Sequence, residues 1–545
     1  MAESAVPSTV TSQLNGERAA ASLESRIGLV AILALVAGFI VRVSIARSRY
    51  LVADEALDYL LVNQGSVLEA YRASLTNAHP PLYYFVLYYT RFLGTSELIL
   101  RLPSVIAGTL MPWFVFLWLK RLDRVTAFIA LLLLTFTPAL LAFSTEIRLY
   151  AFLLLFLTGA LWSLDRAFDE NSLWQVLIFG VFLCLAILTQ YSAIWAACAM
   201  GIYALARIFS EELKKSAIFA WIGSQVCALG VLGSLWVTHI SRMYHEVMRS
   251  VAVNGWLRAE YFHTGKNVFH FGLRATAHAF FYLLTRQTEI SLKLAPSSIA
   301  VVIAVTTLFL FGVIPLLVNR TRGVQPVCPS RRFLGVLIIA AFVIGYAGAL
   351  LGLYPYGGSR HVAYLAPFAV AGIACGIAWL TRQAVWVGFA ATVALLFVCT
   401  LRVEPLSYTS PADQARTQMA RAVKYVHESV PSGGMILVDY NSSLVLRYYL
   451  CRDSAIRTFE DQISEFDCGK YEMARTRGYD WAFTSKNFGP ILVEMEKQFG
   501  WQPGQPIWLA QAAEMRLDSK LLARFGAESS KDFGLNVSVT RLRAP

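Results

Sequence analysis

The sequence predicts an α-helical membrane protein with many spans, followed by a small α/β domain. Of its 545 residues, 57% are hydrophobic and only 15% are charged, whereas soluble globular chains are about a quarter charged. The apolar residues fall in blocks of about 20, the length that a helix needs to cross a bilayer. After residue 401 these blocks stop, and the chain becomes polar and is broken by Pro and Gly.

Eleven apolar blocks are candidates for membrane spans, and helix is the expected form because a backbone in lipid must satisfy its own hydrogen bonds. The first block follows a polar tail, residues 1–26, and has no small-residue cleavage site, so we interpret it as a retained span. Residues 27–401 then form the membrane domain. The blocks are 27–46, 99–119, 125–143, 149–164, 173–189, 191–209, 217–237, 296–318, 333–352, 362–380 and 383–401.

The basic residues predict the orientation of these spans. If the N-terminus is cytoplasmic, the short external connections contain only Arg148 and Arg360, which is the bias of the positive-inside rule. The net charge of +12 then indicates membrane anchoring and not nucleic-acid binding. The cytoplasmic connections would contain Lys120, Arg121, Arg124, Arg166, Arg207, Lys214, Lys215, Arg320, Arg322, Arg331, Arg332 and Arg382.

An odd number of spans places residues 402–545 outside the cytoplasm, where we expect an α/β domain. Apolar runs at 435–438 and 481–483 are typical of buried strands, and helices are expected around 412–428 and 488–499. The two cysteines of this domain, Cys451 and Cys468, would lie in an oxidising compartment. We therefore predict a disulfide between them, with two free buried thiols as the alternative.

Candidate chemistry begins directly after the first span, in the external segment 47–98. Asp54 and Glu55 are adjacent there, and carboxylates near a membrane are costly unless they are solvated, paired or used. The alternative is that this pair caps a helix over about 55–63.

The same segment continues with an aromatic helix behind a Pro-Pro pair. His79 precedes Pro80-Pro81, and Tyr83 lies in the helix predicted over 82–93. This helix is too short to cross the membrane, so we expect it along the interface, where tyrosine is favoured. His79 either contacts a ligand or shapes the loop.

Cationic residues from two other segments are expected on the same membrane face. Arg148 and Tyr150 follow the third span, and Arg360-His361 follow the ninth after a Gly-Gly pair. Arginine holds phosphate with a planar fork of donors, and such a group would stabilise negative charge on a leaving phosphate. The alternatives for each arginine are an interfacial anchor or an ion pair with Glu146.

These residues carry a resemblance to a known class. Asp54-Glu55 after span one, His79-Pro80-Pro81 and Arg101-Leu102-Pro103-Ser104 in span two resemble the C-type (GT-C) membrane glycosyltransferases. The nearest pattern is the bacterial branch that is like dolichyl-phosphate-mannose-protein mannosyltransferase and includes the lipid A aminoarabinose transferase. The resemblance covers about residues 27–400, is strongest from 50 to 150, and does not extend to the C-terminal domain.

The resemblance implies a reaction and assigns its residues. A sugar passes from a polyprenyl-phosphate carrier to a hydroxyl on a lipid, glycan or protein acceptor, outside the cytoplasm and with inversion. Asp54 would be the general base with Glu55 in support. The donor phosphate would meet Arg148, Arg360 and His361, while other substrate contacts are assigned to His79, Tyr83 and Tyr150. We accordingly expect a bacterial inner (plasma) membrane protein of the cell envelope with a periplasmic site.

Other classes fit less well. His79 with Asp54 and Glu55 would suit a divalent metal, but no metal-ligand spacing appears, so no metal is assigned. No glycine-rich nucleotide loop is evident either. A transporter or flippase of lipid-linked sugars is the alternative function, although the spans hold few of the buried charges that ion-coupled transporters use. A non-enzymatic assembly protein is a third reading. The aromatic segment 238–295 either gates a lipid or acceptor path or is an amphipathic connection.

Overall fold

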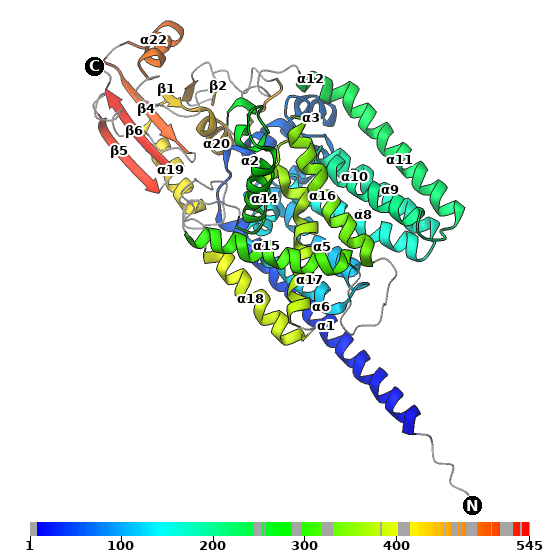
Figure 1. The fold of residues 1–545 in the computed structure, drawn as a ribbon. Coiled ribbons are helices and arrows are strands. Elements are labelled where there is room, and N and C mark those ends of the chain that lie inside the picture. Colours follow the sequence, from blue (N-terminus) through cyan, green and yellow to red (C-terminus); the bar gives the residue numbers. More distant parts are fainter. Residues whose placement is uncertain are drawn as a thin grey trace, which may run out of the picture.

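The computed structural model shows a bundle of helices with a small sheet domain at one end (Figure 1). The first and last described residues belong to the first helix of the bundle and the last strand of the sheet. The structure describes residues 8–244, 253–255, 257–285, 296–318, 331–381, 384–401, 415–451, 453–458, 466–468, 471–475, 488–502, 504–512, 527–534 and 537–543.

Each of the eleven predicted spans coincides with a helix or a bent pair of helices. Among the described residues, seven helices are long and apolar enough to cross a membrane, or eight if the bent pair is one span. Three of the other predicted spans are shorter apolar helices, so the count of eleven is not confirmed. The helices are α1 (Ser8–Ser48), α5 (Glu97–Leu119), α6 (Arg124–Phe136), α7 (Pro138–Ser144), α8 (Tyr150–Asp169), α9 (Leu173–Thr189), α10 (Ala193–Ile208), α11 (Lys215–Leu235), α15 (Pro296–Leu317), α16 (Arg331–Leu350), α17 (Ala366–Leu380) and α18 (Val385–Leu401).

The bent pair is α6 and α7, whose axes differ by 61°. Pro138 is the first residue of α7, and it has no N–H with which to continue the hydrogen bonds of α6. The last carbonyls of α6 therefore lack helical partners. Arg42 of α1 donates to one of them, the carbonyl of Leu134, at 3.4 Å. The bend directs the chain toward the loop that carries Arg148.

Helix α17 lies in the centre of the bundle, with 94% of its span buried. It packs against α15 through backbone contact at glycines: a Cβ at Gly312 or Gly376 would overlap backbone of the facing helix. Small residues allow such close helix approach in membranes. The helix is therefore held firmly behind the loop that carries Arg360.

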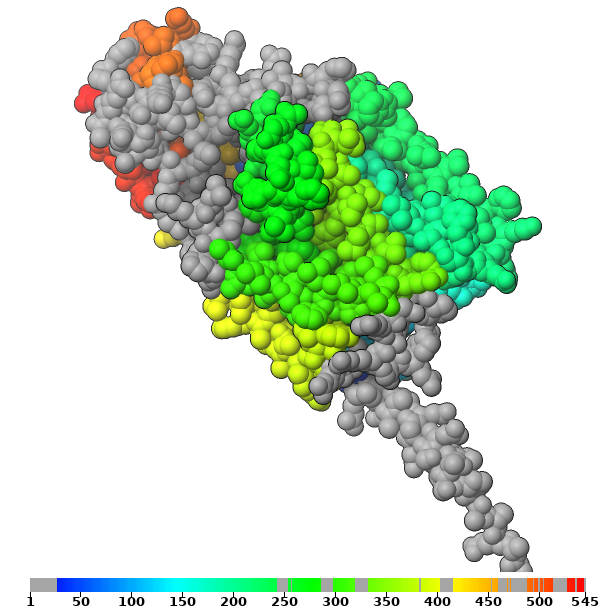
Figure 2. Space-filling model, viewed as in Figure 1, coloured from blue at the N-terminus to red at the C-terminus, as the bar shows by residue number. Residues whose placement is uncertain are grey.

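The surface of the bundle is apolar, as expected for contact with lipid. Figure 2 shows α14, α15 and α16 on one face, with α18 at its edge. Large apolar side chains are exposed on α15 and α18, such as Ile303, Ile314, Trp386 and Phe397. The chain is therefore an integral membrane protein.

Short helices connect the spans on the side that holds the C-terminal domain. Those of the first connection include the helix predicted over 55–63 and the aromatic helix predicted over 82–93. In the segment 238–295, η3 and α14 lie beside the loop before α17. The elements are α2 (Ala53–Val62), α3 (Val67–Ser74), α4 (Leu82–Thr90), η1 (Arg91–Leu93), η2 (Trp236–Ile240), α12 (Ser241–Tyr244), η3 (Arg258–Glu260), α14 (Val268–Thr285) and η4 (Arg360–Leu365).

The described part of the C-terminal domain contains one sheet with the strand order β2-β3-β1-β4-β6-β5. Strand β1 pairs in parallel with β3 and β4, and the other pairs are antiparallel. The predicted α/β character is confirmed, while the strand predicted at 481–483 lies outside the described residues. The elements are α19 (Arg416–Ser429), β1 (Gly434–Val438), α20 (Tyr440–Leu450), β2 (Phe466–Asp467), β3 (Tyr471–Arg475), α22 (Phe488–Phe499), β4 (Pro506–Gln511), β5 (Ala527–Gly534) and β6 (Val537–Arg543).

The C-terminal domain is fastened to α2. The Tyr59 and Tyr448 rings meet edge to face at 5.1 Å, and the Ile456 N–H donates to the Leu60 carbonyl at 3.0 Å. The predicted disulfide between Cys451 and Cys468 is present, with a Cα–Cα distance of 4.9 Å. The disulfide therefore lies just before the residues that dock on α2. The domain boundary predicted at 401/402 adjoins residues outside the described part and stays a prediction.

Candidate active site

Asp54 occupies the first turn of α2 and meets two arginines from distant parts of the chain. Its Oδ2 atom forms an ion pair with Arg360, which is the first residue of η4. The same oxygen lies 3.8 Å from Nη2 of Arg148. The folded chain thus brings together three residues that the sequence placed on one membrane face.

Asp54 is the accessible carboxylate of α2. Its side chain is 37% exposed, whereas the side chains of Glu55 and Asp58 are 0% exposed. Burial alone would raise the pKa of Asp54, but Arg360 and Arg148 hold it below its usual value. Asp54 is therefore ionised at neutral pH and can accept a proton from a bound hydroxyl.

Glu55 is buried and holds Arg101 in an ion pair. Its carboxylate accepts two hydrogen bonds from Arg101, of 2.8 and 2.6 Å, and further bonds from the N–H groups of Ile147 at 2.7 Å and Val52 at 3.1 Å. Both oxygens are occupied by protein donors, so this geometry favours a positioning role. That Glu55 supports the base stays a prediction; the contacts with Arg101 show that it holds the start of α2 in place.

Asp58, which has no role in the sequence-based prediction, lies one helical turn after Asp54 and faces the same way. Its Oδ2 atom pairs with Nη1 of Arg148 at 3.1 Å. Its Oδ1 atom accepts from Tyr84 and from the Asn77 amide, each at 3.2 Å. Burial raises the pKa of Asp58 to about 6, against the opposing effect of Arg148. The i, i+4 spacing of two acids was the available signal for this residue.

His79 joins the site through Arg148. Its Nε2 atom lies 3.2 Å from Nη2 of Arg148, and because a guanidinium only donates, Nε2 must accept. Burial, with Arg148 and Arg360 nearby, holds the pKa of His79 well below its usual value. The loop itself is held by His239 of the π-helical turn η2, which contacts the Asn77 carbonyl at 2.8 Å.

The two predicted tyrosines are packed away from solvent. Tyr83 and Tyr150 are each 1% exposed. The Tyr83 ring meets Phe152 at 5.7 Å, and the Tyr150 ring meets Phe143 at 5.2 Å. Contact of Tyr83 and Tyr150 with substrate stays a prediction. In the structure both rings pack against phenylalanine rings and contribute to the core beside the site.

The loop before α17 supplies Arg360 and His361. Ser359 precedes η4, and its Oγ atom accepts from the His361 N–H at 3.4 Å and contacts His361 Nδ1 at 2.9 Å. It also donates to Glu260, at 2.6 Å. Sequence reasoning missed Glu260, because nothing in its neighbourhood indicates that segment 238–295 reaches this loop.

The described residues contain no group of three or more His, Cys, Asp or Glu side chains arranged to hold a metal ion. Two of the side chains considered for a metal have other partners: Glu55 forms an ion pair with Arg101, and Nε2 of His79 faces Arg148. The absence of a metal requirement stays a prediction.

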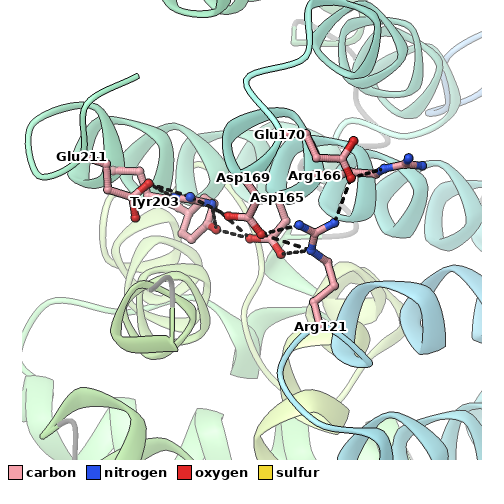
Figure 3. A network of polar contacts seen from close by, with 8 residues as sticks. Arg121, Asp165, Arg166, Asp169, Glu170, Tyr203 and Glu211 are labelled. Atoms are coloured by element: carbon pink, nitrogen blue, oxygen red, sulfur yellow. Dashed lines mark hydrogen bonds and ion pairs between the residues drawn. The ribbon is translucent and has the colours of Figure 1, made fainter. Parts of the chain in front are cut away.

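A second polar network lies at the other ends of α5 and α8 (Figure 3). Arg101 and Arg121 are 20 residues apart, which is roughly 30 Å along a helix. The carboxylate of Asp169 accepts from Arg121 at 2.5 Å and from Arg207 at 2.7 Å. Figure 3 shows these groups bridging the ends of several helices, so we interpret the network as a structural fastener. Its other members are Asp165, Arg166, Glu170, Tyr203 and Glu211.

The chain has the fold of membrane glycosyltransferases of the GT-C type, and comparisons with known proteins support this likeness. Residues 78–236 match the family model described as dolichyl-phosphate-mannose-protein mannosyltransferase. This match includes His79 and Arg148 and ends at the start of η2. Among curated proteins, none matches the sequence.

Two solved structures show the same fold. The chain is similar to ArnT from Cupriavidus metallidurans bound to undecaprenyl phosphate, with a TM-score of 0.50 and 14% identity over 94% of this chain and 98% of that one. It is also similar to the archaeal oligosaccharyltransferase AglB from Archaeoglobus fulgidus, in complex with an inhibitory peptide and a dolichol-phosphate. There the TM-score is 0.51, with 12% identity over 88% of this chain and 69% of that one. The predicted resemblance is thus supported at the level of the fold.

Proposed function

We propose that the chain transfers a sugar from a polyprenyl-phosphate carrier to an acceptor hydroxyl on the extracytoplasmic side, with inversion at the anomeric carbon. The observation that carries the proposal is the placement of one accessible carboxylate, Asp54, between Arg148 and Arg360. A base and two phosphate-binding cations are the groups that such a displacement requires.

The ion pairs of Asp54 suggest how donor binding prepares the base. A donor phosphate that binds Arg360 and Arg148 competes with Asp54 for the same guanidinium groups. As those cations turn toward phosphate, the pKa of Asp54 rises from its depressed value. Asp54 then becomes a stronger base at the moment when the sugar is in place.

The transfer itself needs no covalent enzyme intermediate. The acceptor oxygen attacks the anomeric carbon as the bond from that carbon to the phosphate oxygen breaks, and the acceptor proton passes to Asp54. Polyprenyl phosphate leaves with the bonding electrons, and Arg360 and Arg148 stabilise its additional negative charge. Attack opposite the leaving group inverts the configuration.

The positions of the two polar clusters support the proposed sidedness. Arg121 and Arg207 belong to the network at the far ends of α5 and α10, where the positive-inside rule expects the cytoplasm. The candidate site and the C-terminal domain lie at the opposite end, which we assign to the periplasm of a bacterial inner membrane. The carrier bound in the ArnT structure, undecaprenyl phosphate, is the donor lipid we propose to test first.

Donor use tests the assignment of Arg360. Purified wild type is compared with Arg360→Met, and with Arg72→Met as a control that removes the same charge from an exposed position in α3. We expect the KM for a polyprenyl-phosphate sugar to rise at least about tenfold in Arg360→Met, the loss expected for a charge-assisted hydrogen bond, and to stay unchanged in the control. Equal KM values in all three proteins would contradict the phosphate role.

A further inference from the structure

Segment 238–295 reaches the candidate site through Glu260, the last residue of η3. The Tyr356 N–H donates to the Glu260 carbonyl at 3.0 Å, and the Phe262 N–H donates to the Ala349 carbonyl at 3.3 Å. A Cβ on Gly357 would lie 2.9 Å from Glu260 Cγ, so a larger residue there would disturb this contact. Backbone and side chain of Glu260 are therefore both seated on the loop that carries Arg360.

The Glu260 carboxylate is linked to His361 by one hydroxyl group. Ser359 Oγ lies 2.6 Å from Glu260 Oε2 and 2.9 Å from His361 Nδ1. A serine hydroxyl carries one hydrogen, so it donates to one of these two neighbours and accepts from the other. The protonation of Glu260 thus decides the direction of both hydrogen bonds.

The two arrangements differ at Nε2 of His361, the ring nitrogen that does not contact Ser359. With Glu260 ionised, Ser359 donates to it, and His361 must carry its proton on Nδ1 and leave Nε2 as an acceptor. With Glu260 protonated, the acid donates to Ser359, Ser359 donates to Nδ1, and the neutral ring then carries its proton on Nε2.

We infer that Glu260 is a positioning residue that acts through Ser359 to set which nitrogen of His361 carries the proton. The inference rests on the proposed function and on the sequence-based assignment of His361 to the donor phosphate. Burial, with Arg360 and Arg148 nearby, lowers the pKa of His361 to about 3 against the opposing effect of Asp54, so the ring is neutral at physiological pH. The Tyr354 ring lies 6.0 Å from the His361 ring. A ring with Nε2–H can donate to phosphate, whereas a ring with a bare Nε2 repels it.

The switch falls in the physiological range. Burial raises the pKa of Glu260 to about 7, while the hydrogen bond from Ser359 opposes the rise. Tyr354 is a further titratable group near Glu260. Below this pKa the acid is protonated and His361 presents a donor, and above it the donor is lost. Donor affinity should therefore fall as the pH rises through about 7.

Kinetics with a polyprenyl-phosphate sugar test this directly, because a phosphodiester keeps a single charge across the range. We expect the wild-type KM to rise about tenfold between about pH 6 and about pH 8, the loss of one charge-assisted hydrogen bond. Glu260→Gln offers an amide N–H to Ser359 at every pH, so its KM should stay at the low-pH value. Ser359→Ala, which interrupts the link, should also lose the pH response, whereas Glu69→Gln, at an exposed position of α3, should keep it. The same rise in Glu260→Gln as in wild type would overturn the inference.

A spectroscopic measurement separates this inference from the proposed function. In protein labelled with ¹⁵N-histidine, the His361 signals are identified by their loss in His361→Asn. We expect the protonated nitrogen to change from Nε2 to Nδ1 as the pH rises in wild type, and to stay Nε2 in Glu260→Gln. An unchanged tautomer in wild type contradicts the inference even if the enzyme is active. A wild type that consumes no donor contradicts the proposed function, while the spectra still decide the role of Glu260.

Discussion

Removing Arg101 should destabilise the membrane domain more than removing any exposed arginine. Arg101 is 0% exposed and donates to both oxygens of Glu55. It also donates to the carbonyls of Ala46, Arg49 and Tyr50, at 2.8, 2.8 and 2.9 Å. One side chain therefore ties the end of α1 and the start of α2 to α5.

The loss of stability in Arg101→Met depends on how Glu55 is left without its cationic partner. In Arg101→Met, Glu55 stays buried with only the N–H groups of Ile147 and Val52 as donors. Breaking a buried ion pair by removing one partner costs about 3–5 kcal/mol. With an unfolding entropy of about 2.1 cal/mol/K per residue, a membrane domain over 27–401 loses roughly 1.3 °C per kcal/mol, so the apparent Tm should fall by about 4–6 °C.

Thermal unfolding in detergent, followed by intrinsic fluorescence, measures the effect. Arg47→Met removes an exposed arginine from the same end of α1 and should shift the Tm by no more than about 2 °C, as surface substitutions do. The double variant Glu55→Gln with Arg101→Met leaves no uncompensated charge, so it should be more stable than Arg101→Met alone. A Tm for Arg101→Met within about 2 °C of wild type, or a double variant that is less stable, would refute this account of the ion pair.

Three further outcomes are expected. The pKa of Asp58 is raised to about 6, so its contribution to stability is present near pH 4 and is lost as the pH rises through about 6; Asp58→Asn should remove that slope in pH-dependent unfolding, and an unchanged slope would argue against it. Thiol labelling of denatured protein should leave Cys451 and Cys468 unmodified without reductant and modify both after reduction; full labelling without reductant would exclude the disulfide. Arg207→Met breaks buried ion pairs and should cost about 3–5 kcal/mol with no change in donor KM; a rise in KM would link the network to the site.

The membrane fold could be predicted from the sequence. Hydrophobic blocks indicate which segments contact lipid, and the distribution of basic residues indicates which side of the membrane the connections face. The sequence also placed Asp54, Arg148 and Arg360 on one face, since alternation of spans requires no knowledge of packing. The block at 125–143 shows the limit of this prediction. The third predicted span is bent by 61° at Pro138. A hydropathy profile averages over a window of residues, so it shows one continuous apolar block where the helix is broken.

The roles within the site depended on burial, which sequence alone could not supply. Asp54 and Glu55 are adjacent, yet neighbouring residues on a helix point about 100° apart. One therefore meets solvent and the arginines, while the other is enclosed against Arg101. The contact of Glu260 with Ser359 joins residues 99 positions apart, and no local pattern could have indicated it.

Sugar transfer by wild type and Asp54→Asn tests the central claim most directly. Both proteins are incubated with a panel of polyprenyl-phosphate sugars and membrane extract as acceptor source, with and without chelator. We expect wild type to consume one donor with or without chelator, and Asp54→Asn to lose at least about 10²-fold in rate, the usual contribution of a general base, with unchanged folding. Full activity of Asp54→Asn, or no donor consumption by wild type, would contradict the account.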